Sequence, residues 1–546
     1  MKSVPKMGVE KRGAPTRGFR QSQATLHTWS GLLLGWVLFV VFVAGTIAFW
    51  RQPLNRWTRP DLPRVEQPLV SLAGAQAYLR QRAGDATAWY ITLPSAQDPG
   101  TQLFWIPRAK PGQAGGEDYY ANSALISGEG RPVLSGDTRG GDFFYRLHFD
   151  LHYMPVIWAR WIVGVAAMIM LVAIVTGIVT HKKIFADFFT LRRGRGQRSW
   201  LDGHAATAVL ALPFHLMITY TGLVTLVAML MPWAAVANYN DATKLNAALF
   251  PQAPAGASKG GAAPLGDLTA IVRDGQRRLG APVTYIEVTS PGEAGARVTV
   301  TQIPAAQLSA RPPRLTYDGV SGRMLWRSPP SDGASETQGV MVGLHAGRFA
   351  GEALRWLYFL CGVGGSLMVA SGLVLWTVKR REKLPDPARP HLGFRPVERL
   401  NVAVVGGFPL ACVGFLWANR LLPPGMADRA DGEIGASFAI WAAAGLAALA
   451  LKPRIAWTGL LGTTGLAAAL LAPYDALLLR PGLFGWVARG DWAMAGVDLT
   501  LLALGVAFAW MARRVARHRV KVRPARRIRA ERPAAVATAG ELVPAE

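Results

Sequence analysis

The stretch RLHFDLHYMPVIWARWIVGVAAMIMLVAIVTGIVTHKK, residues 146–183, decides the fold of this chain. Between residues 155 and 180 its only charged side chain is Arg160, close to the beginning of the apolar run. About twenty consecutive apolar residues cross the hydrocarbon core of a bilayer, so this run predicts a transmembrane helix. Histidines at the ends of a span indicate ligands or proton carriers, or else polar groups satisfied at the interface. Three histidines flank the run: His148, His152 and His181.

The composition of the whole chain also predicts a membrane protein. Of the 546 residues 51% are hydrophobic and 19 are tryptophan, which is typical of a polytopic membrane protein. The formal net charge of +25 lies mostly in short segments between apolar runs and in the tails. This distribution follows the positive-inside rule and requires no nucleic-acid partner. Cys361 and Cys412 lie in apolar runs without CxxC or Cys/His spacing, which argues against a disulfide framework, a zinc site or an iron–sulfur cluster.

Eight apolar runs alternate with polar segments, and the basic segments place both termini on the cytoplasmic side. We therefore predict a mainly α polytopic protein of about eight transmembrane helices with two small α+β extracytoplasmic domains. The basic N-terminal tail leads directly into a full-length span, which predicts an uncleaved anchor. The predicted order is a basic tail (1–25), span one (26–50), outer domain one (51–150), span two (155–181), an inner loop (182–203), span three (204–231), outer domain two (232–345), span four (354–378), an inner loop (379–398), four further spans (399–512) and a basic, disordered tail (513–546).

The first 380 residues contain an internal repeat. In spans one and three a histidine precedes a late glycine by 18 residues: His27 and Gly45, then His204 and Gly222. Spans two and four share three residues at an offset of 195: Arg160, Trp161 and Gly177 against Arg355, Trp356 and Gly372. Leu151-His152 matches Leu344-His345 if two residues are inserted. Two copies in the same orientation imply a pseudo-twofold axis along the membrane normal.

The two outer stretches resemble each other. Each has a helix-like segment, 69–82 and 265–279, and then β-rich runs at 89–93 and 102–106, or at 283–289 and 297–303. Each closes on a strand–turn pattern, at 124–134 and 315–325. Neither stretch offers a nucleophile–base pair, a phosphate-binding loop or a dense metal cluster, so the chemistry is expected at the histidines of the spans.

The predicted topology places those histidines at different depths in the membrane. His27, His181 and His204 lie at the inner ends of spans one to three, and His148, His152 and His345 lie just before the outer ends of spans two and four. His215 follows His204 by 11 residues. In a straight helix the two differ by only about 20° in azimuth and by about 16 Å in depth. Imidazoles at two depths suit two haems stacked across a membrane.

A bis-histidine haem has no open axial position, which favours electron transfer over oxygen chemistry. The repeat pairs His27 with His204 for an inner haem and His152 with His345 for an outer one. His215 is the main rival for the outer site and His148 a lesser one, while His181 is the alternative for the inner site. A CxxCH motif is absent, so the predicted cofactor is haem b, in two copies. Arg160 and Arg355 are candidates for contacts to haem propionates, or else snorkelling interface residues.

The patterns YRLHFDLH (145–152), THKKIFADFFTLRRGRGQRSWLDGH (180–204), LPFHLMITYTGL (212–223) and GLHAGRFAGEALRW (343–356) resemble the PepSY-associated transmembrane family over about residues 20–382. The outer domains resemble PepSY domains. The family includes iron-regulated inner-membrane proteins of bacteria, some of them di-haem ferric-siderophore reductases. The resemblance implies a multi-pass protein of the bacterial inner membrane that takes electrons from a quinol or a cytoplasmic reductant and reduces a ferric siderophore or another ferric chelate.

A second hypothesis belongs to another class. The outer domains would be binding or inhibitory modules, and the spans an anchor or a permease component without redox activity. In that case the histidines would be structural or would bind a metal. A reduced-minus-oxidised spectrum separates the two hypotheses, because only the first requires haem.

Overall fold

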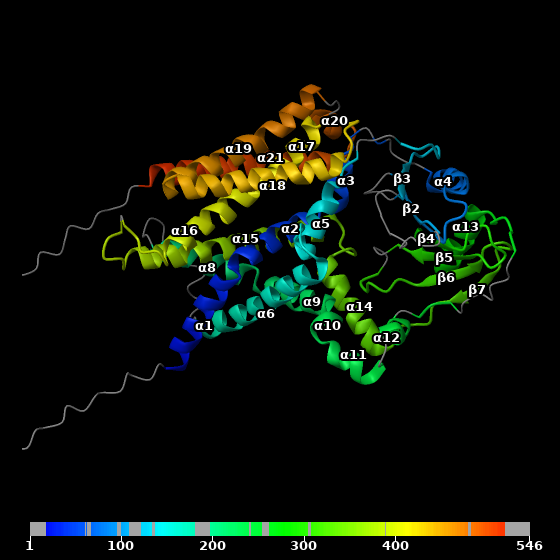
Figure 1. Ribbon diagram of the computed structural model, residues 1–546, viewed down its shortest axis with the longest axis horizontal. Coiled ribbons are helices and arrows are strands. Elements are labelled where there is room, and N and C mark those ends of the chain that lie inside the picture. The colour runs from blue at the N-terminus through cyan, green and yellow to red at the C-terminus, as the bar shows by residue number, and fades with distance from the viewer. Residues whose placement is uncertain are drawn as a thin grey trace, which may run out of the picture.

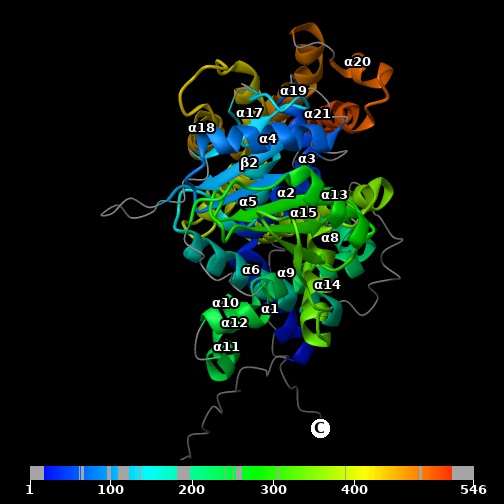
Figure 2. The ribbon, with the colours of Figure 1, turned by 90° about the vertical axis from the view of Figure 1, so that its right-hand side faces the viewer.

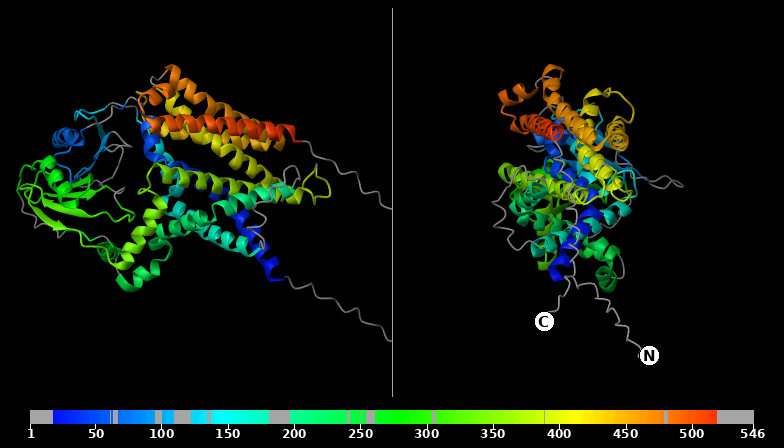
Figure 3. Two further views of the ribbon diagram at one scale, coloured as in Figure 1. Left: turned by 180° about the vertical axis from the view of Figure 1, so that it is seen from behind. Right: turned by 90° about the vertical axis from the view of Figure 1, so that its left-hand side faces the viewer.

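The computed structural model describes residues 18–60, 62, 67–94, 100–108, 122–133, 137–180, 197–239, 242–249, 251–253, 261–303, 307–387, 389–478 and 482–518. A helix bundle forms one half of this molecule and a β-sheet lies beyond one end of the bundle (Figure 1). We call that end the sheet end. The opposite, distal end holds the beginning of α1 and the end of α21 (Figures 1 and 3).

Six helices of the described residues are long and apolar enough to cross a membrane, and the count rises to eight if each of two bent helix pairs is one span. The chain is therefore a mainly α polytopic membrane protein. The long helices are α6 (Val156–Thr180), α15 (Glu352–Arg381), the continuous run α16–η2–α17 (Arg395–Leu400, Asn401–Gly406, Gly407–Leu421), α18 (Arg429–Ala450), α19 (Pro453–Leu478) and α21 (Trp492–Arg517).

The two bent pairs occupy equivalent places in the repeat. The pair α1 (Phe19–Leu33) and α2 (Gly35–Ala48) bends by 65°, and the pair α8 (Gln197–Leu210) and α9 (Leu212–Thr225) bends by 68°. The breaks fall at Leu34 and Ala211, which are separated by the same offset as His27 and His204. The prediction of one straight helix carrying His204 and His215 on a shared face is thus wrong, because the break lies between them.

Short helices join the bundle to the sheet or extend the spans. They are α3 (Arg51–Trp57), α5 (Gly140–Asp150), α10 (Val227–Leu230), α11 (Pro232–Tyr239), α12 (Ala242–Leu249), α14 (Gly333–Ala346) and α20 (Gly482–Ala488). Of these, α5 and α14 directly precede spans two and four, at residues that the sequence analysis assigned to the outer domains. They pack against α2 and α9, and therefore belong to the bundle.

The strands of the two outer stretches form one antiparallel sheet in the order β3-β2-β1-β4-β5-β6-β7. The first stretch supplies β1 (Ala88–Thr92), β2 (Thr101–Ile106) and β3 (Ser123–Ile126), and the second supplies β4 (Val283–Thr289), β5 (Arg297–Gln302), β6 (Arg314–Asp318) and β7 (Met324–Arg327). One hydrophobic core spans both halves. The α+β composition predicted for each stretch is therefore found, but the two stretches fold as one layer.

A pseudo-twofold axis passes between β1 and β4. Ile91 pairs with Ile286, and on either side Tyr90 pairs with Glu287 and Thr92 with Tyr285. Ile91 and Ile286, like Tyr90 and Tyr285, differ by 195 in number, which is the offset of the sequence repeat. Equivalent strands that pair antiparallel are related by an axis perpendicular to the sheet. Because the same repeat relates the spans, the sheet lies across the end of the bundle.

Two equivalent helices cover one face of the sheet. They are α4 (Pro68–Arg82) and α13 (Leu268–Leu279), and both lie on the side away from the bundle (Figures 1 and 2). Residues on that face, such as Trp89 and Val288, are buried, as is Leu72 of the covering helix α4. The alternate residues of each strand point to the other face, which is turned toward the bundle.

The C-terminal helices α16–α21, which we call the C-terminal unit, pack on one side of the bundle (Figure 1). Buried polar contacts attach them near the sheet end: Trp57 Nε1 donates to Asp498 Oδ1 at 2.8 Å, and Thr138 Oγ1 donates to Glu433 Oε2 at 2.5 Å. Within the unit Arg420 forms a bidentate ion pair with Asp475 at 2.8 and 2.9 Å. Such contacts fix the unit rigidly against the first repeat.

Candidate functional site

Two histidine pairs lie between the spans. The distal pair is His27 of α1 and His204 of α8, whose ring centroids are 6.3 Å apart with an interplanar angle of 65°. The sheet-end pair is His148 of α5 and His345 of α14, with centroids 6.0 Å apart and planes 29° apart. Each pair joins one residue to its repeat equivalent, so both pairs straddle the pseudo-twofold axis.

Each of the four imidazoles is held by a backbone carbonyl of a neighbouring span. The Nδ1 atoms lie 2.8 Å from Ala173 O (His27), 2.7 Å from Val41 O (His148), 2.9 Å from Met368 O (His204) and 3.0 Å from Ile218 O (His345). A carbonyl only accepts hydrogen bonds, so each Nδ1 carries the proton and each Nε2 carries the lone pair. Hydrogen bonds of this type orient histidines that ligate metals.

A glycine lies beside each of these rings, four residues after the accepting carbonyl. A Cβ added at Gly45 would lie 2.6 Å from His148 Cε1, and one at Gly222 would lie 2.9 Å from His345 Cε1. The corresponding distances are 3.2 Å from Gly177 to His27 and 3.1 Å from Gly372 to His204. Any larger residue at these four positions would therefore displace an imidazole. We call these four late glycines of the repeat, against which the rings pack, the glycine seats.

The four seats share a local sequence pattern: VFVAG (41–45), AIVTG (173–177), ITYTG (218–222) and MVASG (368–372). Three of them add a hydroxyl near Nδ1, at 3.4 Å from Thr176, 3.3 Å from Thr221 and 3.2 Å from Ser371. In the sequence these glycines mark the repeat. The small residue–glycine pattern, repeated in four spans, was the signal that could have assigned one histidine to each span.

The spacing within each pair fits two ligands of one metal ion. Two imidazoles that share a metal through bonds of about 2 Å place their ring centroids roughly 6 Å apart. Among the described residues there is no group of three or more His, Cys, Asp or Glu side chains that could hold a metal ion. Two facing imidazoles are a donor set that would fit a haem, which needs only two ligands from the protein.

His152 does not face His345, in contrast to the pairing predicted from the repeat. It follows the end of α5 in a left-handed turn, with φ values of 52° at Leu151, 52° at His152 and 48° at Tyr153. Its ring stacks on Phe438 with centroids 5.6 Å apart. Burial lowers the pKa of His152, although Asp431 partly opposes the shift. The turn directs His152 toward the C-terminal unit, and His148, one turn earlier, takes the position opposite His345.

His215, the other rival, belongs to neither pair. It is fully buried on α9, its Nε2 lies 3.4 Å from Cys361 O, and Phe42 lies edge-on with its centroid 6.1 Å away. Among the described residues its Nδ1 has no hydrogen-bond partner. His181, the alternative for the distal site, lies outside the described residues. The structure therefore brings together four of the seven candidate histidines.

The two candidate arginines have protein partners. Arg160 Nε donates to Asp150 Oδ1 at 2.9 Å, and its guanidinium lies over the ring of Phe149. Arg355 is buried in the first turn of α15 and donates to Ala350 O at 3.3 Å. Both lie at the sheet end of their spans, and a role for either at a propionate stays a prediction.

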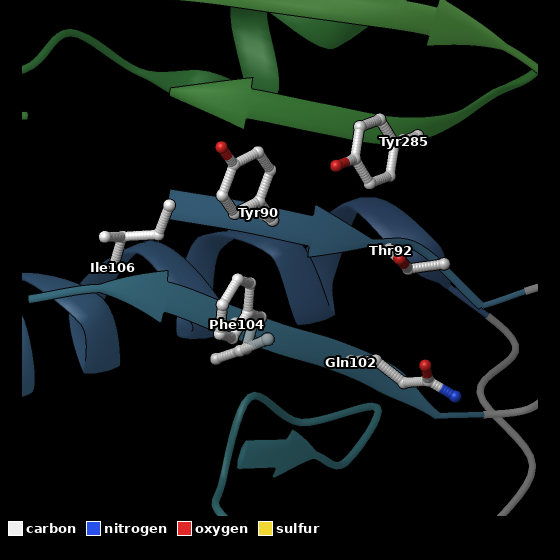
Figure 4. Close-up of a pocket in the computed structure, with 7 residues that line it drawn as sticks. Tyr90, Thr92, Gln102, Phe104, Ile106 and Tyr285 are labelled. Atoms are coloured by element: carbon white, nitrogen blue, oxygen red, sulfur yellow. The ribbon is translucent and has the colours of Figure 1, made fainter. Parts of the chain in front are cut away.

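The bundle-facing side of the sheet carries a pocket of about 240 Å³, lined mainly by β1 and β2 with Tyr285 of β4 at its edge (Figure 4). Tyr90 stacks on Phe104 with centroids 5.5 Å apart and on Tyr285 with centroids 6.2 Å apart, so three rings form a row across β2, β1 and β4. Burial raises the pKa of the neighbouring Glu287, and Arg314 opposes this shift. The row offers flat apolar surface with polar groups beside it.

Two comparisons relate this chain to known proteins. The model of a family described as "PepSY-associated TM region" matches residues 24–379. The uncharacterized protein PA4219 of Pseudomonas aeruginosa is 30% identical over 377 residues, which cover 65% of this chain and 91% of that protein. The matched family range contains all four paired histidines and ends before the C-terminal unit.

Proposed function

We propose, from the premise that this chain belongs to the PepSY-associated transmembrane family, that it is a b-type di-haem oxidoreductase. It passes electrons across the bacterial inner membrane to a ferric chelate such as a ferric siderophore. The observation that carries the proposal is the pair of facing imidazoles at each end of the bundle, with centroids 6.3 and 6.0 Å apart. Two bis-histidine centres on one axis are the arrangement expected of transmembrane electron transfer.

The residues of the chain have separate tasks in this proposal. His27 and His204 would hold one haem and His148 and His345 the other, each through Nε2. The carbonyls at Nδ1 keep the rings neutral and oriented, and the glycine seats let the helices approach closely. Haem bound at these pairs would supply reversible one-electron transfer.

In this proposal the substrate binds at the sheet end. The row of Tyr90, Phe104 and Tyr285 lies on the face of the sheet that is turned toward the bundle, so a chelate held there would lie on the same side of the sheet as the sheet-end pair. Each ferric ion takes up one electron and becomes ferrous, and a quinol or a cytoplasmic reductant supplies the electron. Oxygen ligands hold the softer ferrous ion less tightly, so reduction favours release of the iron.

The test uses the full chain in phospholipid vesicles, with a reductant enclosed, a ferric trihydroxamate chelate outside and a ferrous-specific dye as indicator. Haem-loaded wild type should produce external Fe(II), His148→Ala should produce none above protein-free vesicles, and the matched control His152→Ala should retain most of the rate. If haem-loaded wild type produces no external Fe(II), the binding-module or permease hypothesis replaces this one.

A Tyr90→Ala/Tyr285→Ala variant tests the placement of the chelate. It should raise KM for the chelate several-fold and leave the haem content unchanged. The control is Trp326→Ala, an aromatic residue paired with Thr316 at the far edge of the sheet. An equal change of KM in both variants would contradict the placement.

A further inference from the structure

A deep groove separates the repeat from the C-terminal unit. Its walls are α15 on one side and α21 on the other, its floor comes largely from α2 and α17, and its volume is about 2670 Å³. The two walls diverge from each other across this space, while α21 packs chiefly on α19. Unlike the histidine sites, this groove breaks the twofold symmetry, because only one side of the repeat meets the C-terminal unit.

The groove is apolar through the depth of the hydrocarbon. Trp492 and Trp510 of α21 both line it and are 66% and 57% exposed, and Leu367 of the opposite wall is 48% exposed. The two tryptophans are 18 residues apart, which is about 27 Å along a helix and close to the thickness of the hydrocarbon core. Apolar walls of this extent require apolar chains to cover them.

The two ends of the groove differ in charge. Among the described residues that line it, the distal end has eight basic side chains and one carboxylate, Glu398, which is already paired with Arg381. At the sheet end, Arg56 is paired with Asp491 and Glu352 with Arg355, so no excess of cations remains there. An occupant with an anionic headgroup is therefore favoured at the distal end only. Six of the basic residues there are Arg381, Arg395, Arg399, Lys452, Arg513 and Arg514.

We propose that this groove binds an anionic phospholipid. The phosphate lies among the basic side chains of the distal end, and the acyl chains cover the apolar walls between α15 and α21. Basic pockets between transmembrane helices recognise anionic headgroups in this way. A neutral quinone would fit the apolar walls but would gain nothing from the excess of cations.

The bound lipid has a consequence for the distal histidine pair. Ser371 lines the groove, and its Oγ lies 3.2 Å from Nδ1 of His204. Acyl chains in the groove therefore exclude water from the wall of that pair. The C-terminal unit therefore has a structural role, which is to complete a lipid-filled seal around the repeat. The proposal of a bound lipid does not depend on the proposed redox function.

The experiment compares two triple variants with equal loss of charge. Lys452→Gln/Arg513→Gln/Arg514→Gln removes cations of the groove, and Lys379→Gln/Lys383→Gln/Arg389→Gln removes three cations that do not line it. Each purified full-length protein is stripped of lipid, mixed with phosphatidylglycerol or phosphatidylcholine, and weighed by native mass spectrometry. Wild type and the control triple should retain phosphatidylglycerol, and the groove triple should retain at least tenfold less.

A second variant, Ala507→Trp, fills the groove without changing its charge and should also lower retention. Elution as a monodisperse species on gel filtration shows that each variant is folded. Three results would overturn the proposal: equal retention by the two triples, equal binding of the two lipids by wild type, or stoichiometric quinone without phospholipid in protein extracted from the membrane.

Discussion

His148 and His345 face each other at the sheet end with ring centroids 6.0 Å apart, and each is bonded to a carbonyl of a different span. The two residues come from helices that immediately precede spans two and four, and they are equivalent in the two copies of the repeat. A centre held by this pair would therefore tie the two halves of the bundle together, and one held by the distal pair would do the same at the other end.

Replacement of His148 should remove one of the two haems, because it supplies half of the axial ligation of the sheet-end centre. We expect His148→Ala and His345→Ala each to lower the haem content per chain by about half, measured by pyridine haemochrome. His152→Ala is the matched control and should keep the full content. Full haem content in His148→Ala together with loss in His152→Ala would restore the pairing predicted from the sequence.

The glycine seats can be tested without removing a ligand. Gly45→Val should displace the ring of His148, because even a Cβ at this position would lie 2.6 Å from Cε1. We expect loss of the sheet-end haem and a destabilisation of about 1–3 kcal/mol from overpacking. Gly459→Val is the control, since nothing lies within 4 Å of a Cβ at Gly459. Equal haem content and thermal stability in the two variants would show that the seat has no role.

The buried ion pair of the C-terminal unit predicts a large effect on stability. Asp475→Leu leaves Arg420 without its carboxylate, and removal of one partner of a buried pair costs about 3–5 kcal/mol. Asp431→Leu removes the exposed partner of Arg139 and should cost no more than about 1 kcal/mol. Thermal unfolding in detergent, followed by tryptophan fluorescence, compares them. A smaller loss of stability for Asp475→Leu than for Asp431→Leu would contradict the burial argument.

The orientation in the membrane is tested by labelling single cysteines from one side. In a background with Cys361→Ala and Cys412→Ala, Lys383→Cys marks the distal end and Ser331→Cys the sheet side. A membrane-impermeant maleimide should label only Ser331→Cys in intact spheroplasts and only Lys383→Cys in inverted vesicles, because basic segments remain in the cytoplasm. Labelling of Lys383→Cys in intact spheroplasts would reverse the proposed orientation.

Much of this architecture follows from local patterns in the sequence. Apolar runs locate the spans, and β4 begins and ends at the predicted residues, Val283 and Thr289, because the segment is rich in β-branched and aromatic residues. The repeat also placed His27 opposite His204, because both begin a span. These features depend on periodicity and spacing, which a single chain displays directly.

Long-range features could not be predicted from the sequence. Leu147-His148 and Leu151-His152 both precede span two and both resemble Leu344-His345 of the second copy. The first pair is two residues farther from Leu344-His345 than the offset of 195, and the second pair is two residues closer, so the repeat alone could not choose between them. The end of α5 makes the choice, because the left-handed turn at residues 151–153 sends His152 away from the axis. Pairing of β1 with β4 depends on contacts between residues about 195 apart, which periodicity within each stretch does not reveal.

The central claim is tested most directly by the haem content and spectrum of the purified wild-type chain, expressed in haem-replete cells. The account predicts two b-type haems per chain, with the sharp, low-spin reduced-minus-oxidised spectrum of bis-histidine ligation. It predicts one haem in His27→Ala or His148→Ala, and none in the double variant. Wild-type protein without haem, or a double variant that binds as much haem as wild type, would contradict it.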